Sequence, residues 1–294
     1  MAFERWKAWF ERSRSVQRFK LHHTEINQIY WSLVPVGSCA SYLARKARDD
    51  DRPVEVFHAS GPHARRLAPS IREWKADFKE YENWARLSML VSALSYFEAY
   101  TSTVVTLALR SDPLARFGDS RAIDGASWLK KEMSDDITEL VVACVRGEWS
   151  KRMSGYRRLF GIVPPALAEL EGSLERMRIL RNGSAHSFGR TPTYFEDPLA
   201  SAGASERISE DLLLEYLGNI EKAAIAIDEH ILPAHLGEFD LISLYHSWQK
   251  LPRAEKEPRY LEVTAFSRQI NRLFGQTPGR LFCRDLIAYY NRLR

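Results

Sequence analysis

The chain has few cysteines and lacks the leader expected of a secreted protein. Its 294 residues include three cysteines, Cys39, Cys144 and Cys283, which lie far apart and form no CxxC pair. This spacing argues against a disulfide framework and against a zinc motif, and it suits a reducing environment. Residues 1–20 have no continuous apolar core of the kind that a signal peptide needs. We therefore expect a cytoplasmic protein.

The chain also lacks a clean membrane span and a series of strands. Residues 87–109 are apolar over a length that would cross a bilayer, but Glu98 lies at their middle. A charge there costs about 3 kcal/mol on insertion scales, so a buried bundle helix is favoured and no membrane partner is expected. The β-like run at residues 54–57 is too isolated to build a sheet.

Negative charge is scarce at the two ends of the chain. Residues 1–20 carry six basic side chains against two acidic ones, and residues 251–294 carry nine against four, although the net charge is only +4. Basic ends suit a phosphate polymer such as RNA, or an acidic partner. Ordinary solvated surface is the alternative interpretation.

Helical periodicity dominates what is present. The expected helices are residues 3–20, residues 24–48 with a break near Pro35–Gly37, residues 70–110, a helix capped by Ser134, a helix through Arg181, a helix capped by Ser209 that ends before Pro233, and two or three short C-terminal helices. The sequence thus predicts an all-α protein.

One helix carries an arginine where an apolar residue is expected. Leu167, Leu170, Leu174 and Met177 are spaced +3, +4 and +3, which marks the inward stripe of an amphipathic helix. The next position on the stripe is Arg181. A guanidinium on a core-facing stripe is costly unless something pairs with it, and an imidazole follows five residues later.

The run Arg181-Asn182-Gly183-Ser184-Ala185-His186 resembles the Arg-[Asn/Asp/His]-x-x-x-His signature of the HEPN superfamily. Residues 94–100, in an early long helix, also resemble that family. The resemblance covers roughly residues 80–232 and implies a HEPN-like four-helix bundle. We accordingly expect an N-terminal helical extension at 1–75, the bundle at 76–235, and a basic helical C-terminal extension at 236–294.

The resemblance implies a metal-independent endoribonuclease, of the kind found among toxins and antiphage defence effectors. It implies Arg181 and His186 as the catalytic pair, with Asn182 as the polar residue beside the arginine. It also implies a homodimer in which two Arg/His pairs form one composite site. No metal or cofactor is expected, and an antitoxin or regulatory subunit is an expected partner besides RNA.

The chemistry of these residue types agrees with this activity. RNA carries its own nucleophile, the 2′-OH, and an imidazole with a pKa near ~6.5 can move either proton at neutral pH. Arginine stays charged and binds two phosphate oxygens, so the products would be a 2′,3′-cyclic phosphate and a 5′-OH. Five residues on a helix are about 140° apart. Either Gly183 ends or distorts the helix, or Arg181 and His186 come from two chains.

Several other residues are candidates for RNA binding or for support of the pair: Glu98, Arg178, Ser184, Ser187 and Arg190. Glu98 lies on the apolar face of its own helix and is expected to orient Arg181 or Arg178 by a charge-assisted bond. Two alternatives stay open. One is a non-catalytic HEPN module that binds nucleic acid, nucleotide or a partner protein, and the other is a helical scaffold in which Arg181 and Glu98 form a buried ion pair.

Overall fold

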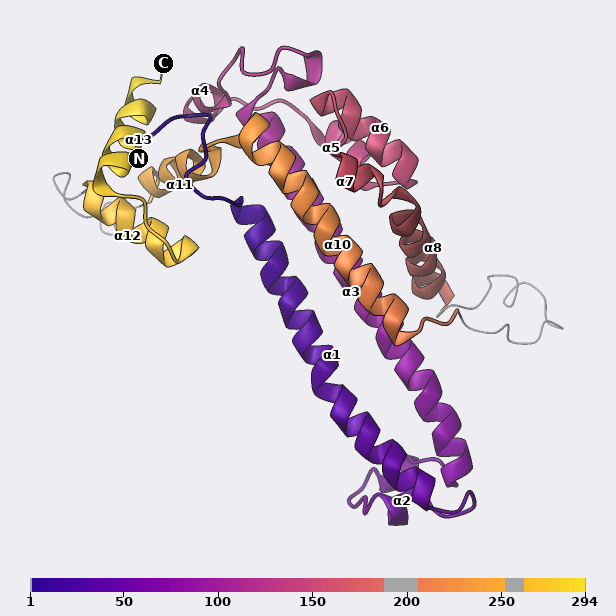
Figure 1. Cartoon of the computed structure of the whole chain (residues 1–294). Coiled ribbons are helices and arrows are strands. Elements are labelled where there is room, and N and C mark those ends of the chain that lie inside the picture. Colours follow the sequence, from indigo (N-terminus) through magenta and orange to yellow (C-terminus); the bar gives the residue numbers. More distant parts are fainter. Residues whose placement is uncertain (1, 188–205, 252–261, 294) are drawn as a thin grey trace. The chain divides into compact units, whose positions relative to one another are not determined.

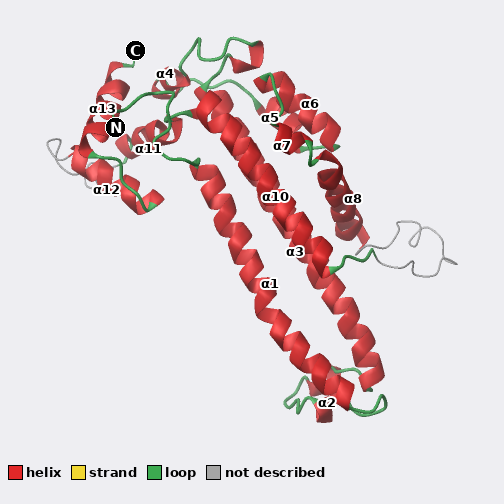
Figure 2. Cartoon of the chain, viewed as in Figure 1, coloured by secondary structure: helices red, strands yellow, loops and turns green. Residues whose placement is uncertain are grey.

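The structure is a computed structural model that describes residues 2–187, 206–251 and 262–293. Helices form almost all of the regular structure in these residues, and Figure 2 shows no strand among them. The one β-type contact is an isolated bridge between Glu4 and Lys7. The all-α prediction is confirmed.

The main helices are long at the N-terminal side of the chain and shorter toward its end (Figure 1). They are α1 (Arg14–Lys46), α2 (Pro53–Val56), α3 (Ile71–Ser111), α4 (Gly125–Lys130), α5 (Thr138–Val145), α6 (Trp149–Phe160), α7 (Pro165–Ala168), α8 (Glu171–Ser187), α10 (Glu210–Ile231), α11 (Phe239–Gln249), α12 (Glu262–Phe274) and α13 (Arg280–Arg292). Within the described residues, no helix is apolar over enough of its length to cross a bilayer.

The chain divides into two compact units that do not follow the boundaries expected at residues 75 and 235. Unit 1 consists of residues 1–20, 97–172 and 221–294, and unit 2 of residues 21–96 and 173–220. Residues 1–75 are therefore not one extension, because their first part belongs to unit 1 and the rest to unit 2. Residues 236–294 belong to unit 1.

The core of unit 2 is formed by parts of α1, α3, α8 and α10. Leu90 of α3, Leu174 of α8 and Leu213 of α10 are almost completely buried there. The side chain of Asn83 bonds the backbone of residues 206 and 208, which holds the start of α10 against α3. Ser209 caps α10 through a 3.1 Å bond from the Leu212 N–H to its hydroxyl, as expected.

Unit 1 has a core rich in aromatic side chains. Phe97 of α3 stacks on Trp149 of α6 with ring centroids 5.8 Å apart, and the Tyr100 hydroxyl donates to the Ala224 carbonyl at 2.9 Å. The five-residue π-helical turn η3 (Leu232–Leu236) links α10 to α11. Apolar residues with helical spacing in the sequence are buried along the whole length of α10, from its unit 2 part into its unit 1 part: Leu213, Leu217, Ile220, Ala224, Ile227 and Ile231.

Three expected helix boundaries were wrong. The helix expected at residues 3–20 begins only at Arg14, and α1 passes through Pro35 without the expected break. A proline removes one backbone bond and strains its helix, but nothing forces a break where the flanking turns continue. The helix expected to be capped by Ser134 begins at Thr138. Residues 54–57 include most of the short helix α2 rather than a strand.

The segment before α1 is irregular and is tied to unit 1 through buried acids. The Trp9 N–H donates to the Glu238 carboxylate, and the Arg14 N–H donates to Asp240 at 3.2 Å. Burial raises the pKa of Glu238 to about 8 and that of Asp240 to about 6, although these bonds oppose the change. Glu238 is therefore protonated in the folded protein over much of the neutral range.

We expect Glu238→Gln to remove a pH dependence of stability from this unit. A raised carboxyl pKa adds stability that is fully present below the ordinary value of 4.5 and is lost as the pH rises through about 8. The wild type should lose a few kcal/mol over this window, by the order-of-magnitude conversion of a pKa shift, and Glu238→Gln should not. Thermal melts from pH 5 to pH 8.5 measure this, with the exposed Glu215→Gln as control. Parallel curves for wild type and Glu238→Gln would contradict the expectation.

Candidate functional site

The sequence-predicted site lies on the last turns of α8, within unit 2. Leu174 and Met177 on its inner stripe are fully buried, as expected. Arg181, the next position on that stripe, is partly exposed. Its guanidinium donates to the Asn182 side-chain oxygen at 3.4 Å, which is a long bond. The arginine therefore ends the apolar stripe of α8 where the helix reaches solvent.

Gly183 neither ends nor bends α8, which remains helical to Ser187. Position 186 is therefore about 140° around the helix from Arg181. It shares a face with Gly183 and with Ile179, which is 56% exposed. A Cβ added at Gly183 would meet no described atom within 4 Å, so this face is open. The helix does not bring positions 181 and 186 onto one face.

The neighbouring Arg178 is held within its own helix. Its guanidinium donates to both carboxylate oxygens of Glu175, at 2.9 and 2.6 Å. Such a bidentate pair fixes the plane of the guanidinium. A link to the next helix comes from Asn219 of α10, which donates to Ser173 at 3.0 Å. Glu175 is thus a carboxylate that orients Arg178.

Glu98 pairs with arginines of unit 1. Its carboxylate lies 3.1 Å from the guanidinium of Arg152 and 3.9 Å from that of Arg146. The side chain of Arg152 is only 4% exposed and that of Glu98 14%. Arg152 also donates to the Gly147 carbonyl and lies over the Trp149 ring. The structure thus gives Glu98 two arginine partners within unit 1, and the expected contact of Glu98 with Arg181 or Arg178 stays a prediction.

The remaining predicted residues are only partly within the described structure. Ser184, His186 and Ser187 have their backbone in α8, but their side chains lie outside the described part. Arg190 lies outside the described residues altogether.

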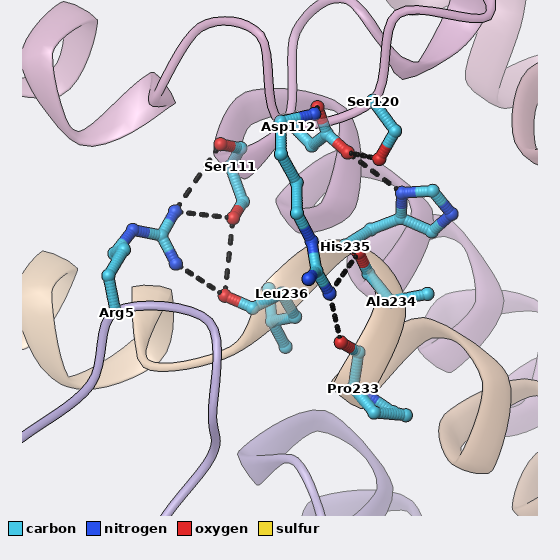
Figure 3. Close-up of polar contacts among 9 residues, drawn as sticks. Arg5, Ser111, Asp112, Ser120, Pro233, Ala234, His235 and Leu236 are labelled. Atoms are coloured by element: carbon cyan, nitrogen blue, oxygen red, sulfur yellow. Dashed lines mark hydrogen bonds and ion pairs between the residues drawn. The ribbon is translucent and has the colours of Figure 1, made fainter.

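A second polar cluster, in unit 1, was missed by sequence reasoning (Figure 3). Asp112 is fully buried and accepts bonds from Ser120 at 2.5 Å, from the Arg121 N–H at 2.7 Å and from His235 at 2.9 Å. Burial favours a raised pKa for Asp112, but the bonds from His235, Ser120 and Arg121 hold that pKa below its ordinary value. Asp112 directly follows α3 and precedes Pro113, and nothing in this local sequence marks it as a buried carboxylate.

The composition of this cluster resembles a nucleophilic triad, but its bonding does not. Ser120 and His235 both bind the same oxygen of Asp112. The serine proton therefore goes to the carboxylate and not to the imidazole, whereas a triad needs the imidazole between the two. Arg5 lies beside the cluster and donates to Ser111 at 2.7 Å and to the Leu236 carbonyl at 2.8 Å. These bonds tie the end of α3, η3 and the N-terminal segment together.

Neither cluster holds a ready metal site. In the part of the chain that the structure describes, no three His, Cys, Asp or Glu side chains gather closely enough to ligate an ion.

Comparisons of this chain with protein-family models, with characterised proteins and with solved structures found no match.

Proposed function

We propose that this chain is a metal-independent endoribonuclease that acts as a homodimer, with Arg181 and His186 as its catalytic pair. The observation that carries the proposal is the end of the buried stripe of α8. After Leu174 and Met177 the stripe reaches a guanidinium that keeps part of its surface in solvent. We propose that a phosphate reaches this solvent-facing side and binds the guanidinium through two parallel hydrogen bonds.

The chemistry assigned to the pair is transesterification by the substrate itself. One imidazole takes the proton from the 2′-OH, which attacks the adjacent phosphorus, and a proton passes to the departing 5′-oxygen. Arg181 stabilises the extra negative charge on the phosphoryl oxygens, and Asn182 holds the guanidinium from the side. The products are a 2′,3′-cyclic phosphate and a 5′-OH.

The helical geometry of α8 is the reason for proposing two copies. Since positions 181 and 186 are about 140° apart around the helix, we propose that Arg181 of one copy and His186 of the other act on the same phosphate. Ile179 exposes 56% of its surface on the face of position 186, and Gly183 leaves that face open. Apolar surface beside an unobstructed glycine suits burial against a second copy.

The cellular role follows only from the resemblance to HEPN proteins. We propose a toxin or antiphage defence effector in the cytoplasm, restrained by an antitoxin or a regulatory subunit. The alternative is a non-catalytic HEPN module that binds nucleic acid, nucleotide or a partner protein. If the chain acts as a monomer, the angle of about 140° between positions 181 and 186 favours this non-catalytic alternative.

Cleavage of labelled single-stranded RNA and tRNA in EDTA tests the proposal. Wild type should give cyclic-phosphate and 5′-OH ends, and His186→Ala should give none at unchanged thermal stability. Arg157→Ala removes an exposed arginine of α6 and serves as the control that keeps activity. Binding without cleavage by wild type would support the alternative, and cleavage only on addition of a divalent metal would contradict the mechanism.

A further inference from the structure

Unit 1 contains a cavity of about 270 Å³ that none of the features above uses. It lies between the end of α3, the loop through Arg116, α4 and α11. Its volume is close to the lower limit of small-molecule pockets, roughly 300 Å³. This size fits a compact organic molecule and not a peptide or a polynucleotide.

The side chains that line the cavity carry one more positive charge than negative charges. Arg116 pairs with Asp135 at 2.6 Å, and Lys250 pairs with Glu132 at 2.8 Å. Arg110 also lines the cavity, and it has no ion pair with any residue in the described ranges. The lining thus carries three positive and two negative side chains, which is a surplus of one positive charge.

Arg116 supplies a donor that the protein itself does not use. Its Nε atom is buried and has no hydrogen-bond acceptor among the described residues, although its terminal nitrogen is paired with Asp135. A buried donor without an acceptor costs about 1–3 kcal/mol. Because Arg116 lines the cavity, a ligand oxygen there would remove this cost once a small movement of the side chain brings Nε within reach.

His246 also lines the cavity, and one tautomer of its ring supplies a second donor. Its Nδ1 is 2.6 Å from the Tyr290 hydroxyl, and burial together with Lys250 lowers the pKa of the imidazole. A neutral imidazole that accepts the tyrosine proton at Nδ1 carries its own proton at Nε2. Since His246 lines the cavity, Nε2 is the ring nitrogen left for a ligand.

The rest of the wall is apolar and partly aromatic. Trp128 of α4 and Phe239 of α11 line the cavity together with Leu109. Flat apolar rings pack well against aromatic side chains, and an arginine adds an interaction with a ring face. The polar groups therefore select for an oxyanion and the remaining wall selects for a planar apolar body.

From these features we infer that the cavity binds a small planar aromatic monoanion, with its carboxylate or phosphodiester oxygens directed to Arg110, Arg116 and His246. The surplus of one positive charge matches a single negative charge on the ligand. This site is independent of α8 and of the proposed nuclease activity.

Calorimetric titration of the full chain with 2-naphthoate tests the inference against 2-naphthamide, which has the same shape without the charge. We expect saturable 1:1 binding of the acid and at least tenfold weaker binding of the amide. Arg110→Gln should weaken naphthoate at least tenfold, because it removes the surplus charge. Arg116→Lys keeps the charge but has no Nε–H, and it should weaken naphthoate several-fold.

Thermal melts show whether each variant is folded, and Arg157→Gln is the control for loss of an exposed arginine elsewhere in unit 1. Arg110 is exposed and has no ion pair in the described structure, so its replacement should leave the melting temperature unchanged. Equal affinity for acid and amide, unchanged binding by Arg110→Gln, or no saturable binding of naphthoate up to its solubility limit would each overturn the inference.

Discussion

Mixing the Arg181→Ala and His186→Ala chains should restore about one quarter of the wild-type rate of RNA cleavage. Each variant alone should be at least about a hundredfold slower, which is the scale of losing one proton-transfer or charge-stabilising group. If a site takes Arg181 from one copy and His186 from the other, random exchange makes half of the dimers mixed. In each mixed dimer the composite site keeps one intact Arg181/His186 combination of its two, which gives about a quarter of the full activity.

A second mixture serves as the control for this result. The double variant Arg181→Ala/His186→Ala contributes neither group, so its mixed dimers with wild type contain no complete site. Adding an equal amount of it should halve the rate that the wild-type chains give alone. No recovery in the first mixture, together with no loss in the second, would show that a composite site between copies does not exist.

Arg152→Ala should destabilise the protein by about 3–5 kcal/mol, the usual cost of removing one member of a buried ion pair. The variant removes the guanidinium that lies 3.1 Å from the carboxylate of Glu98, a side chain that is only 14% exposed. It also removes the guanidinium from the Trp149 ring and from the Gly147 carbonyl. Chemical denaturation of the variant measures the loss.

Two further variants separate the loss of charge at position 152 from the loss of side-chain packing. Arg152→Met keeps much of the side-chain volume and should still lose stability, because Glu98 remains charged. The double variant Arg152→Met/Glu98→Gln removes both charges and should recover most of the loss. Arg157→Ala, an exposed position on the same helix, should change stability by less than about 0.5 kcal/mol. Equal stabilities of Arg152→Ala and Arg157→Ala would contradict a structural role for the pair.

The long helices could be predicted because each has one apolar stripe of constant period. All six stripe positions of α10 are buried, and α3 was expected within one residue of its bounds. The segment before α1 was wrongly predicted to be helical, also for a physical reason. Phe3 and Phe10 have helical spacing, but they pack on Phe282 and Phe274 of the C-terminal helices from an irregular backbone. Periodicity indicates which residues are buried, but tertiary contacts decide the backbone around them.

The contacts of the candidate residues could not be predicted from the sequence. The position of Glu98 indicated a buried carboxylate, but the chain has 42 lysines and arginines from which its partner had to be chosen. The structure gives Arg152, which is brought close by the packing of unit 1 and has no marker in the sequence. The cluster around Asp112 was missed for the same reason, since His235 lies 123 residues further along the chain.

The composition of unit 1 has a consequence for synthesis on the ribosome. Arg5 leaves the ribosome 231 residues before Leu236, whose carbonyl it binds, which is roughly 10–50 s at ~5–20 residues per second. The aromatic side chains of the N-terminal segment pack on α12 and α13, which are synthesised later still. A nascent chain therefore carries this basic, aromatic segment uncovered until α12 and α13 have been made, and during that interval a chaperone or a co-translationally binding protein can reach it.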